Sequence, residues 1–154
     1  MKEIQDKYIY KSSEVALLIA AIANRRKIVI NATKLQKLLF IVYGSFLSLY
    51  NLRLLDEKPQ CWPYGPVFPK LREDFIAEDF SKVNFSDMRI PKKVKSDHRL
   101  QNVVDFVFNG FGLWSAGDLS AWCLNSLPCK ATPDTGQIID DDLIRTFFNS
   151  IINK

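Results

Sequence analysis

The chain has 154 residues, of which 47% are hydrophobic and 25% are charged. This composition is typical of a globular protein, and the length is enough to bury a core without metal ions or disulfides. The net charge of +4 is a mild basic bias, weaker than the concentrated patch of a dedicated nucleic-acid binder. Because no repeat or low-complexity run interrupts the chain, we expect one compact domain over residues 1–154.

The cysteine and histidine content argues against a metal site. Cys61, Cys123 and Cys129 leave an odd thiol and do not form a zinc-ligand spacing, and His98 is the only histidine. Reduced thiols in a cytoplasmic protein are the simplest interpretation. We expect no metal and no cofactor.

The first apolar run, residues 15–23, resembles the core of a secretory signal because lysines precede it. Acidic residues interrupt that charged region, and the run is too short to span a bilayer. We therefore expect a buried amphipathic helix that starts at Ser12 or Ser13 and ends near Asn24, with no membrane association. The β-branched residues 28–30 predict a short strand or an extended connector.

Residues 33–51 form the most strongly helical segment. Their apolar residues recur at three- and four-residue spacing, and Thr33 is a suitable N-cap. Apolar side chains cover nearly the whole circumference, apart from a narrow strip of Lys37, Gly44 and Ser48. A helix of this kind belongs in the middle of a domain, so the other elements are expected to pack around it.

The next segments predict irregular structure followed by a rigid turn. Residues 52–62 suggest a short extended segment. In residues 62–67, WPYGPV, each proline fixes its own φ and disfavours helix at the preceding residue. We expect a rigid turn here, and Pro66 could occupy the first turn of a helix that runs to about Ala77.

The second half of the chain alternates loops with amphipathic helices. Residues 78–96 lack a periodic pattern and predict a loop or linker, and residues 89–99 are its most basic part. Helices are expected from about residue 97 to Asn109, after Ser115, and from Leu143 to about Ile152. The fold class is therefore mainly α, a single compact helical domain around a central buried helix with at most short strands.

A search for catalytic patterns identifies no catalytic residue. The sequence has no glycine-rich phosphate loop and no Gly-x-Ser-x-Gly elbow. His98 lies in a charged neighbourhood without a nearby acid at catalytic spacing. The three acidic residues 140–142 fit the positive start of the last helix better than a cation site. These observations favour a protein that is not an enzyme.

Lys37 and the turn at residues 62–67 need a specific explanation. Lys37 lies on the polar strip of an otherwise buried helix, so its ammonium group either reaches solvent or finds oxygen partners. In the second case, Gly44 and Ser48 would let a neighbouring backbone approach, and Tyr64-Gly65-Pro66 would supply the oxygen atoms. The turn itself is either a structural corner or a surface whose exposed aromatic groups bind a partner.

Two segments together resemble one known family. Residues 33–40, TKLQKLLF, and residues 61–67, CWPYGPV, are similar to the paired motifs of the Panacea or SocA-like antitoxin domain, also called the phage-associated protein family. The residues that match these motifs are Leu35, Gln36, Lys37, Leu38, Leu39, Trp62, Tyr64, Gly65, Pro66 and Val67. The resemblance extends over most of the chain. It differs at Phe40, where tyrosine is usual, and at Leu124 and Cys129, where the family often has histidine and tryptophan.

The resemblance implies a mostly helical bacterial or prophage protein that neutralises a partner toxin by direct contact. The toxin would be encoded next door, and a Clp-type protease is a further implied partner, because SocA delivers its toxin to such a protease. The implied motif or partner-binding residues are Gln36, Lys37, Trp62, Tyr64, Gly65, Pro66 and Val67. The alternative is a nucleic-acid-binding regulator that uses residues 89–99. A third class is a hydrolase that uses Lys37 and the tyrosine turn.

Overall fold

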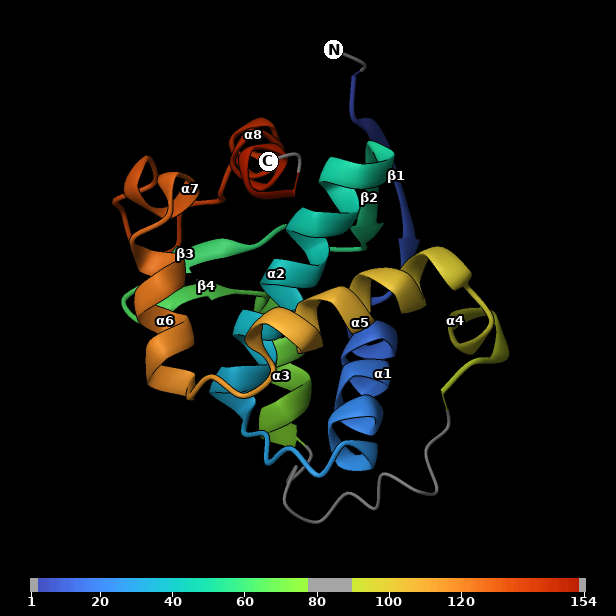
Figure 1. Cartoon of the computed structure of the whole chain (residues 1–154). Helices are drawn as coiled ribbons and strands as arrows, with labels where there is room; N and C mark the ends of the chain where they lie inside the picture. Colours follow the sequence, from blue (N-terminus) through green and yellow to red (C-terminus); the bar gives the residue numbers. More distant parts are fainter. Residues whose placement is uncertain (1–2, 78–89, 153–154) are drawn as a thin grey trace.

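A computed structural model describes residues 3–77 and 90–152 of the chain. Figure 1 shows helices grouped around one helix that crosses the middle of the molecule. That helix is α2 (Ala32–Tyr50), and it contacts α1 (Ser12–Arg25) and three helices of the second half. Of the loop or linker predicted over residues 78–96, residues 78–89 lie outside the described residues. None of the described helices is long and apolar enough to cross a membrane.

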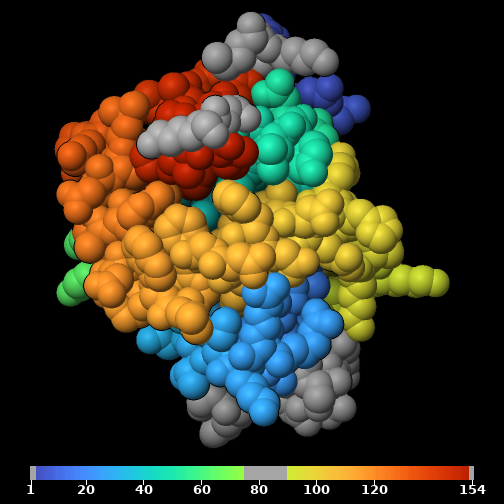
Figure 2. All heavy atoms as spheres, viewed as in Figure 1, coloured from blue at the N-terminus to red at the C-terminus, as the bar shows by residue number. Residues whose placement is uncertain are grey.

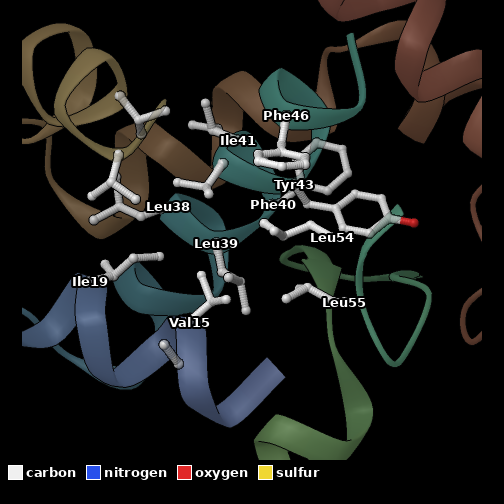
Figure 3. Packing of buried hydrophobic residues seen from close by; sticks show 14 of the residues in the cluster. Val15, Ile19, Leu38, Leu39, Phe40, Ile41, Tyr43, Phe46, Leu54 and Leu55 are labelled. Carbon is white, nitrogen blue, oxygen red and sulfur yellow. The ribbon is translucent and has the colours of Figure 1, made fainter. Parts of the chain in front are cut away.

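The central position predicted for residues 33–51 is confirmed. All residues of α2 from Lys34 to Leu47 are buried. Figure 3 shows Leu39 and Phe40 of this helix pointing into a cluster that also receives Val15 and Ile19 from α1, and leucines from a neighbouring strand. Leu49, which sequence periodicity places on the apolar face, is exposed near the end of the helix. The core is therefore built on most of the circumference of α2.

The ends of α2 differ slightly from the sequence prediction. The N-cap is Asn31, whose Oδ1 accepts from the Lys34 amide at 2.8 Å, so Thr33 lies inside the first turn. The C-cap is Asn51, with φ of 54° in the left-handed region that asparagine tolerates. Residues 28–30 form no strand and connect α1 to the Asn31 cap.

Two small sheets flank the helices. β1 (Gln5–Tyr10) pairs in parallel with β2 (Leu52–Leu55), and β3 (Gln60–Trp62) pairs antiparallel with β4 (Gly65–Val67). The prediction that Pro66 begins a helix is wrong, because Pro66 lies in β4. The following helix α3 (Pro69–Ala77) begins at Pro69 instead, where the missing amide is equally harmless.

A buried carboxylate fixes the start of α3. Glu57 accepts hydrogen bonds from the Lys70 amide at 2.8 Å, the Leu71 amide at 3.0 Å and the Ser12 hydroxyl at 2.6 Å. The first two satisfy amides that a helix start leaves without partners. Because Ser12 begins α1, one side chain ties the first turns of α1 and α3 together.

The second half consists of helices and short connections. α4 (Lys92–Lys95) precedes α5 (His98–Phe111), α6 (Ala116–Leu124), α7 (Leu127–Lys130) and α8 (Asp141–Ile152). The predicted starts near Asp97 and after Ser115 are confirmed, because both side chains accept from amides of the following turn. Part of the predicted loop is helical, since α4 lies within it. α5 also continues two residues beyond Asn109.

Gly44 and Ser48 bring α8 onto α2. A Cβ atom at residue 44 would overlap the Phe148 ring, and the Ser48 hydroxyl hydrogen-bonds Asn149. Gly44 and Ser48 therefore accommodate side chains of α8, and not the backbone of the proline-rich turn as the sequence suggested. The Phe148 ring is also held edge-on by Phe40 at a centroid distance of 5.8 Å.

Gly44→Ala should destabilise the fold by about 1–3 kcal/mol, because the Phe148 ring is enclosed and cannot move without disturbing its aromatic neighbours. Gly110→Ala is the matched control. Residue 110 lies in α5 with open space around its Cβ direction, so alanine should stabilise that helix by about 0.5–1 kcal/mol. Urea unfolding monitored by circular dichroism measures both values. Equal effects at the two positions would contradict the close approach of α8.

Candidate functional site

The candidate site is the β3–β4 hairpin and the side of α2 that holds it. Lys37 is 2% exposed, and its Nζ donates to the carbonyl of Pro66 at 3.0 Å. Of the two alternatives for Lys37, the one in which the turn supplies an oxygen atom is confirmed. The ammonium group does not reach solvent, because the carbonyl of β4 lies above it.

Gln36 makes the neighbouring contacts with the chain just beyond β4. Its side-chain amide accepts from the Phe68 N–H at 2.9 Å and donates to the Phe68 carbonyl at 3.2 Å. This is the pair of bonds that a residue of an adjacent strand would make. Pro66 contributes no N–H, so Lys37 has only a carbonyl to satisfy there. Gln36 and Lys37 together take the place of a third strand along the outer edge of β4.

The opposite edge of the hairpin is also covered. The Cys61 N–H donates to the Gln137 carbonyl at 2.9 Å, and the Cys61 carbonyl accepts from the Gly136 N–H at 2.7 Å. Gly65 has φ of +111°, a conformation that side chains rarely adopt. A Cβ there would lie 3.2 Å from Cε of Lys37. The hairpin is thus fixed along both edges and at its turn.

The tip of the hairpin is the part that faces outward. Tyr64 is 75% exposed, Pro63 is also exposed, and Trp62 is half-buried. The hairpin projects at the left margin of the molecule in the space-filling view (green, Figure 2). The guanidinium of Arg72 lies over the Trp62 ring, 5.1 Å from its centroid.

A groove of about 530 Å³ runs between this tip and the start of α2. Its lining includes five of the residues that the sequence resemblance singled out, together with Arg72 of α3. The lining residues are Ala32, Thr33, Gln36, Lys37, Trp62, Pro63, Tyr64, Val67 and Arg72. Gly65 and Pro66 lie beneath it, buried against α2. The structure therefore brings all seven predicted motif residues into one region.

The three cysteines gather behind the same region, which their sequence spacing did not indicate. Cys61, Cys123 and Cys129 are buried, unpaired and close enough to Lys37 to interact electrostatically with it. Burial raises the pKa of Cys129 to about 12 and that of Cys123 well above its usual value. The thiols of Cys123 and Cys129 therefore stay protonated, and the three buried cysteines fill space near Lys37. Cys129, one of the departures from the family motif, packs in this cluster.

The described residues around the hairpin provide no obvious reaction chemistry. Burial lowers the pKa of Lys37, but its Nζ is occupied by a carbonyl. No group of three or more histidine, cysteine, aspartate or glutamate residues in the described ranges could hold a metal ion. His98 is exposed at the start of α5, away from the hairpin.

Burial also raises the pKa of Asp141, whose carboxylate accepts a hydrogen bond from the Tyr43 hydroxyl at 2.6 Å and ties α8 to α2.

The described part of the basic segment at residues 89–99 is partly engaged in internal contacts. Lys93 Nζ lies 3.6 Å from a carboxylate oxygen of Glu14. Arg99 pairs with Asp97 at 3.5 Å and stacks on the Phe46 ring. These groups orient α4 and α5 against the core, which leaves fewer cations for phosphate contacts than the sequence suggests.

A model of the family described as antitoxin SocA-like, Panacea domain matches residues 35–127, more than half of the 154 residues. The chain belongs to this family. The family resemblance that the paired motifs indicated is confirmed, and the matched range contains residues 35–40 of the α2 motif and the whole hairpin. Among curated proteins and among solved structures, no match to this Panacea domain was found. Leu124 lies within the matched range, half-buried at the end of α6.

The buried Lys37 gives the Panacea domain a measurable pH dependence. Burial lowers the pKa of Lys37 below 10.5 in the folded state, so between the folded and unfolded values the unfolded chain binds more protons and stability rises with pH. The unfolding free energy of the wild type minus that of Lys37→Met should therefore increase as the pH rises toward 10.5. Urea titrations under reducing conditions measure it. A difference that is flat or decreases with pH would contradict the buried ammonium.

Gln36→Leu should remove both bonds to Phe68 and leave two buried backbone groups without partners, at a cost of about 2–4 kcal/mol. The amide proton of Phe68 should then exchange faster with solvent, which hydrogen-exchange NMR detects. Gln101→Leu is the control, because that half-buried side chain of α5 bonds, among the described residues, only the Lys95 carbonyl. Its effect should stay within about 0.5 kcal/mol. An unchanged exchange rate at the Phe68 amide would show that the two Gln36 hydrogen bonds are not needed to hold this segment.

Proposed function

We propose that this Panacea domain is an antitoxin that binds a partner toxin directly and masks it without catalysis. The observation that carries the proposal is the exposed tip of a hairpin fixed along both edges. A rigid aromatic tip offers contact area without the entropy cost of ordering a loop, which is the property of residues that dominate protein interfaces. Membership of an antitoxin-like family supports the same role.

The motif residues divide into two groups with different tasks. Gln36, Lys37, Gly65 and Pro66 point into the fold and position the hairpin. Tyr64 points outward, and no hydrogen bond or ring contact holds it among the described residues. Its ring therefore contributes little to folding. An exposed tyrosine on a braced turn is instead suited to insert into a partner.

Co-expression with the adjacent gene tests this proposal. If the neighbour encodes a toxin, its expression alone should stop growth, and the Panacea domain should restore it. Tyr64→Ala should reduce the affinity for the toxin at least tenfold, about 1.4 kcal/mol or more, since anchor residues at interfaces cost this much when truncated. Growth assays and isothermal calorimetry on the purified pair measure both effects.

Tyr8→Ala serves as the matched control, because Tyr8 is an exposed tyrosine on β1, remote from the hairpin. It should leave rescue and affinity unchanged. The amount of toxin in the cell distinguishes two ways in which the domain could neutralise it. Masking leaves the amount of toxin constant, whereas delivery to a Clp-type protease, as the family resemblance also implies, lowers it in protease-positive cells only. A harmless neighbour, or rescue that is insensitive to Tyr64→Ala, would overturn the proposal.

A further inference from the structure

The charged residues that line the groove at the hairpin are of one sign. Its lining contains two cationic residues, Lys37 and Arg72, and no acidic residue. Lys37 lies on the floor with its Nζ on the Pro66 carbonyl, whereas Arg72 is exposed at the rim. The remaining lining is mostly apolar or aromatic. An occupant that complements this groove must therefore combine an apolar group with negative charge.

Arg72 is the group best placed to receive that charge. Its guanidinium lies over the Trp62 ring, and no carboxylate among the described residues pairs with it. Its neighbour Lys70 differs, since its Nζ already pairs with Asp56 at 3.1 Å. A guanidinium stacked on a ring leaves its in-plane N–H groups able to donate two parallel hydrogen bonds to one carboxylate. Stacking on Trp62 also restricts the side chain before binding, which reduces the entropy cost.

The polar cavity at the start of α8 is a weaker candidate for a specific ligand. Its lining mixes cationic side chains such as Arg53 and Lys58 with acidic ones such as Asp6 and Asp140. Opposite charges within one lining do not select the sign of a ligand. The hairpin groove is different, because aromatic lining and a single charge sign occur together with a guanidinium that no carboxylate of the described residues pairs with.

We propose that the groove binds an acidic segment of the partner protein, in which an aspartate or glutamate carboxylate meets Arg72 and an adjacent apolar side chain packs against Trp62 and Tyr64. This inference rests on the proposed protein-binding function and specifies the chemistry of the bound segment. The contact would be non-covalent. The buried Lys37 supports it from below through the position of Pro66.

Selection of a random dodecapeptide library displayed on phage tests the inference without knowledge of the partner. The immobilised full chain should enrich peptides with an acidic residue close to a tryptophan, phenylalanine or leucine. A synthetic peptide from this selection should lose at least about tenfold in affinity when its acidic residues are changed to amides, because charged hydrogen bonds exceed neutral ones by about this factor. Fluorescence anisotropy measures the binding.

Matched variants then locate the contact. Arg72→Glu should weaken the acidic peptide by more than about tenfold, whereas Lys92→Glu, the same charge change at an exposed residue of α4, should leave it nearly unchanged. Tyr64→Ala should weaken binding, and Tyr8→Ala should not. No enriched peptide, a basic or neutral consensus, equal loss in both charge variants, or occupancy of the groove by a second copy of the chain would overturn the inference.

Toxin neutralisation distinguishes this inference from the proposed function. If the domain rescues growth but Arg72→Glu rescues equally well, the assignment of an acidic segment fails while the antitoxin function stands. If acidic peptides bind through Arg72 but the neighbouring gene is harmless, the groove chemistry stands and the antitoxin function fails. Circular dichroism of Arg72→Glu and Lys92→Glu should be identical to that of the wild type, since both side chains are exposed.

Discussion

A buried ammonium group bonded to a single backbone carbonyl organises this protein. Lys37 projects from the central helix and meets Pro66, the one residue of β4 that has no N–H to offer. The preceding residue of α2, Gln36, hydrogen-bonds both the N–H and the carbonyl of Phe68. Two adjacent helical side chains thereby stabilise a strand edge that would otherwise need another strand. The orientation of the hairpin, and with it the groove, depends on this one junction between a helix and a sheet.

Burying the Lys37 ammonium group is electrostatically unfavourable, but the lysine side chain is well suited to connect α2 with β4. Removing an ammonium group from water is unfavourable, which is why burial lowers the pKa of Lys37. A long flexible stem, however, can cross the layer of side chains between α2 and β4, and the polarisable thiols around it pack closely. A shorter polar residue could not reach Pro66 from the same helical position. Burial of the ammonium group lowers the stability of the fold, and its hydrogen bond fixes the orientation of the hairpin.

The sequence was sufficient to predict the parts of the fold that depend on local periodicity. The buried α2 and the helix starts near Asp97 and after Ser115 follow from spacing. The oxygen partner of Lys37 in the turn was one of two alternatives that the cost of burying a charge left open, and the structure decides between them. The strand β1 could not be predicted, because its residues show no alternation of exposed and buried positions and its pairing with β2 spans two helices.

The site was predicted less completely. The paired motifs identified the residues that come together. Which of them point into the fold to position the hairpin, and which form its exposed tip, appears only in three dimensions. Arg72 was missed because it follows the motif and gains meaning only through its position over Trp62. The sequence also did not indicate that the three cysteines lie together, since their separations along the chain match no metal-ligand pattern. Long-range packing decides each of these features.

The connection between β3 and β4 consists of only two residues, Pro63 and Tyr64, and both are exposed. The hydrogen bonds from Lys37 and from residues 136 and 137 lie behind this connection, on backbone atoms of the flanking strands. Under the proposed function, amino acid exchanges at Tyr64 would alter recognition while leaving the hydrogen bonds that hold the hairpin intact. A lineage could in this way acquire new binding specificities by drift at a surface position, without passing through unfolded intermediates.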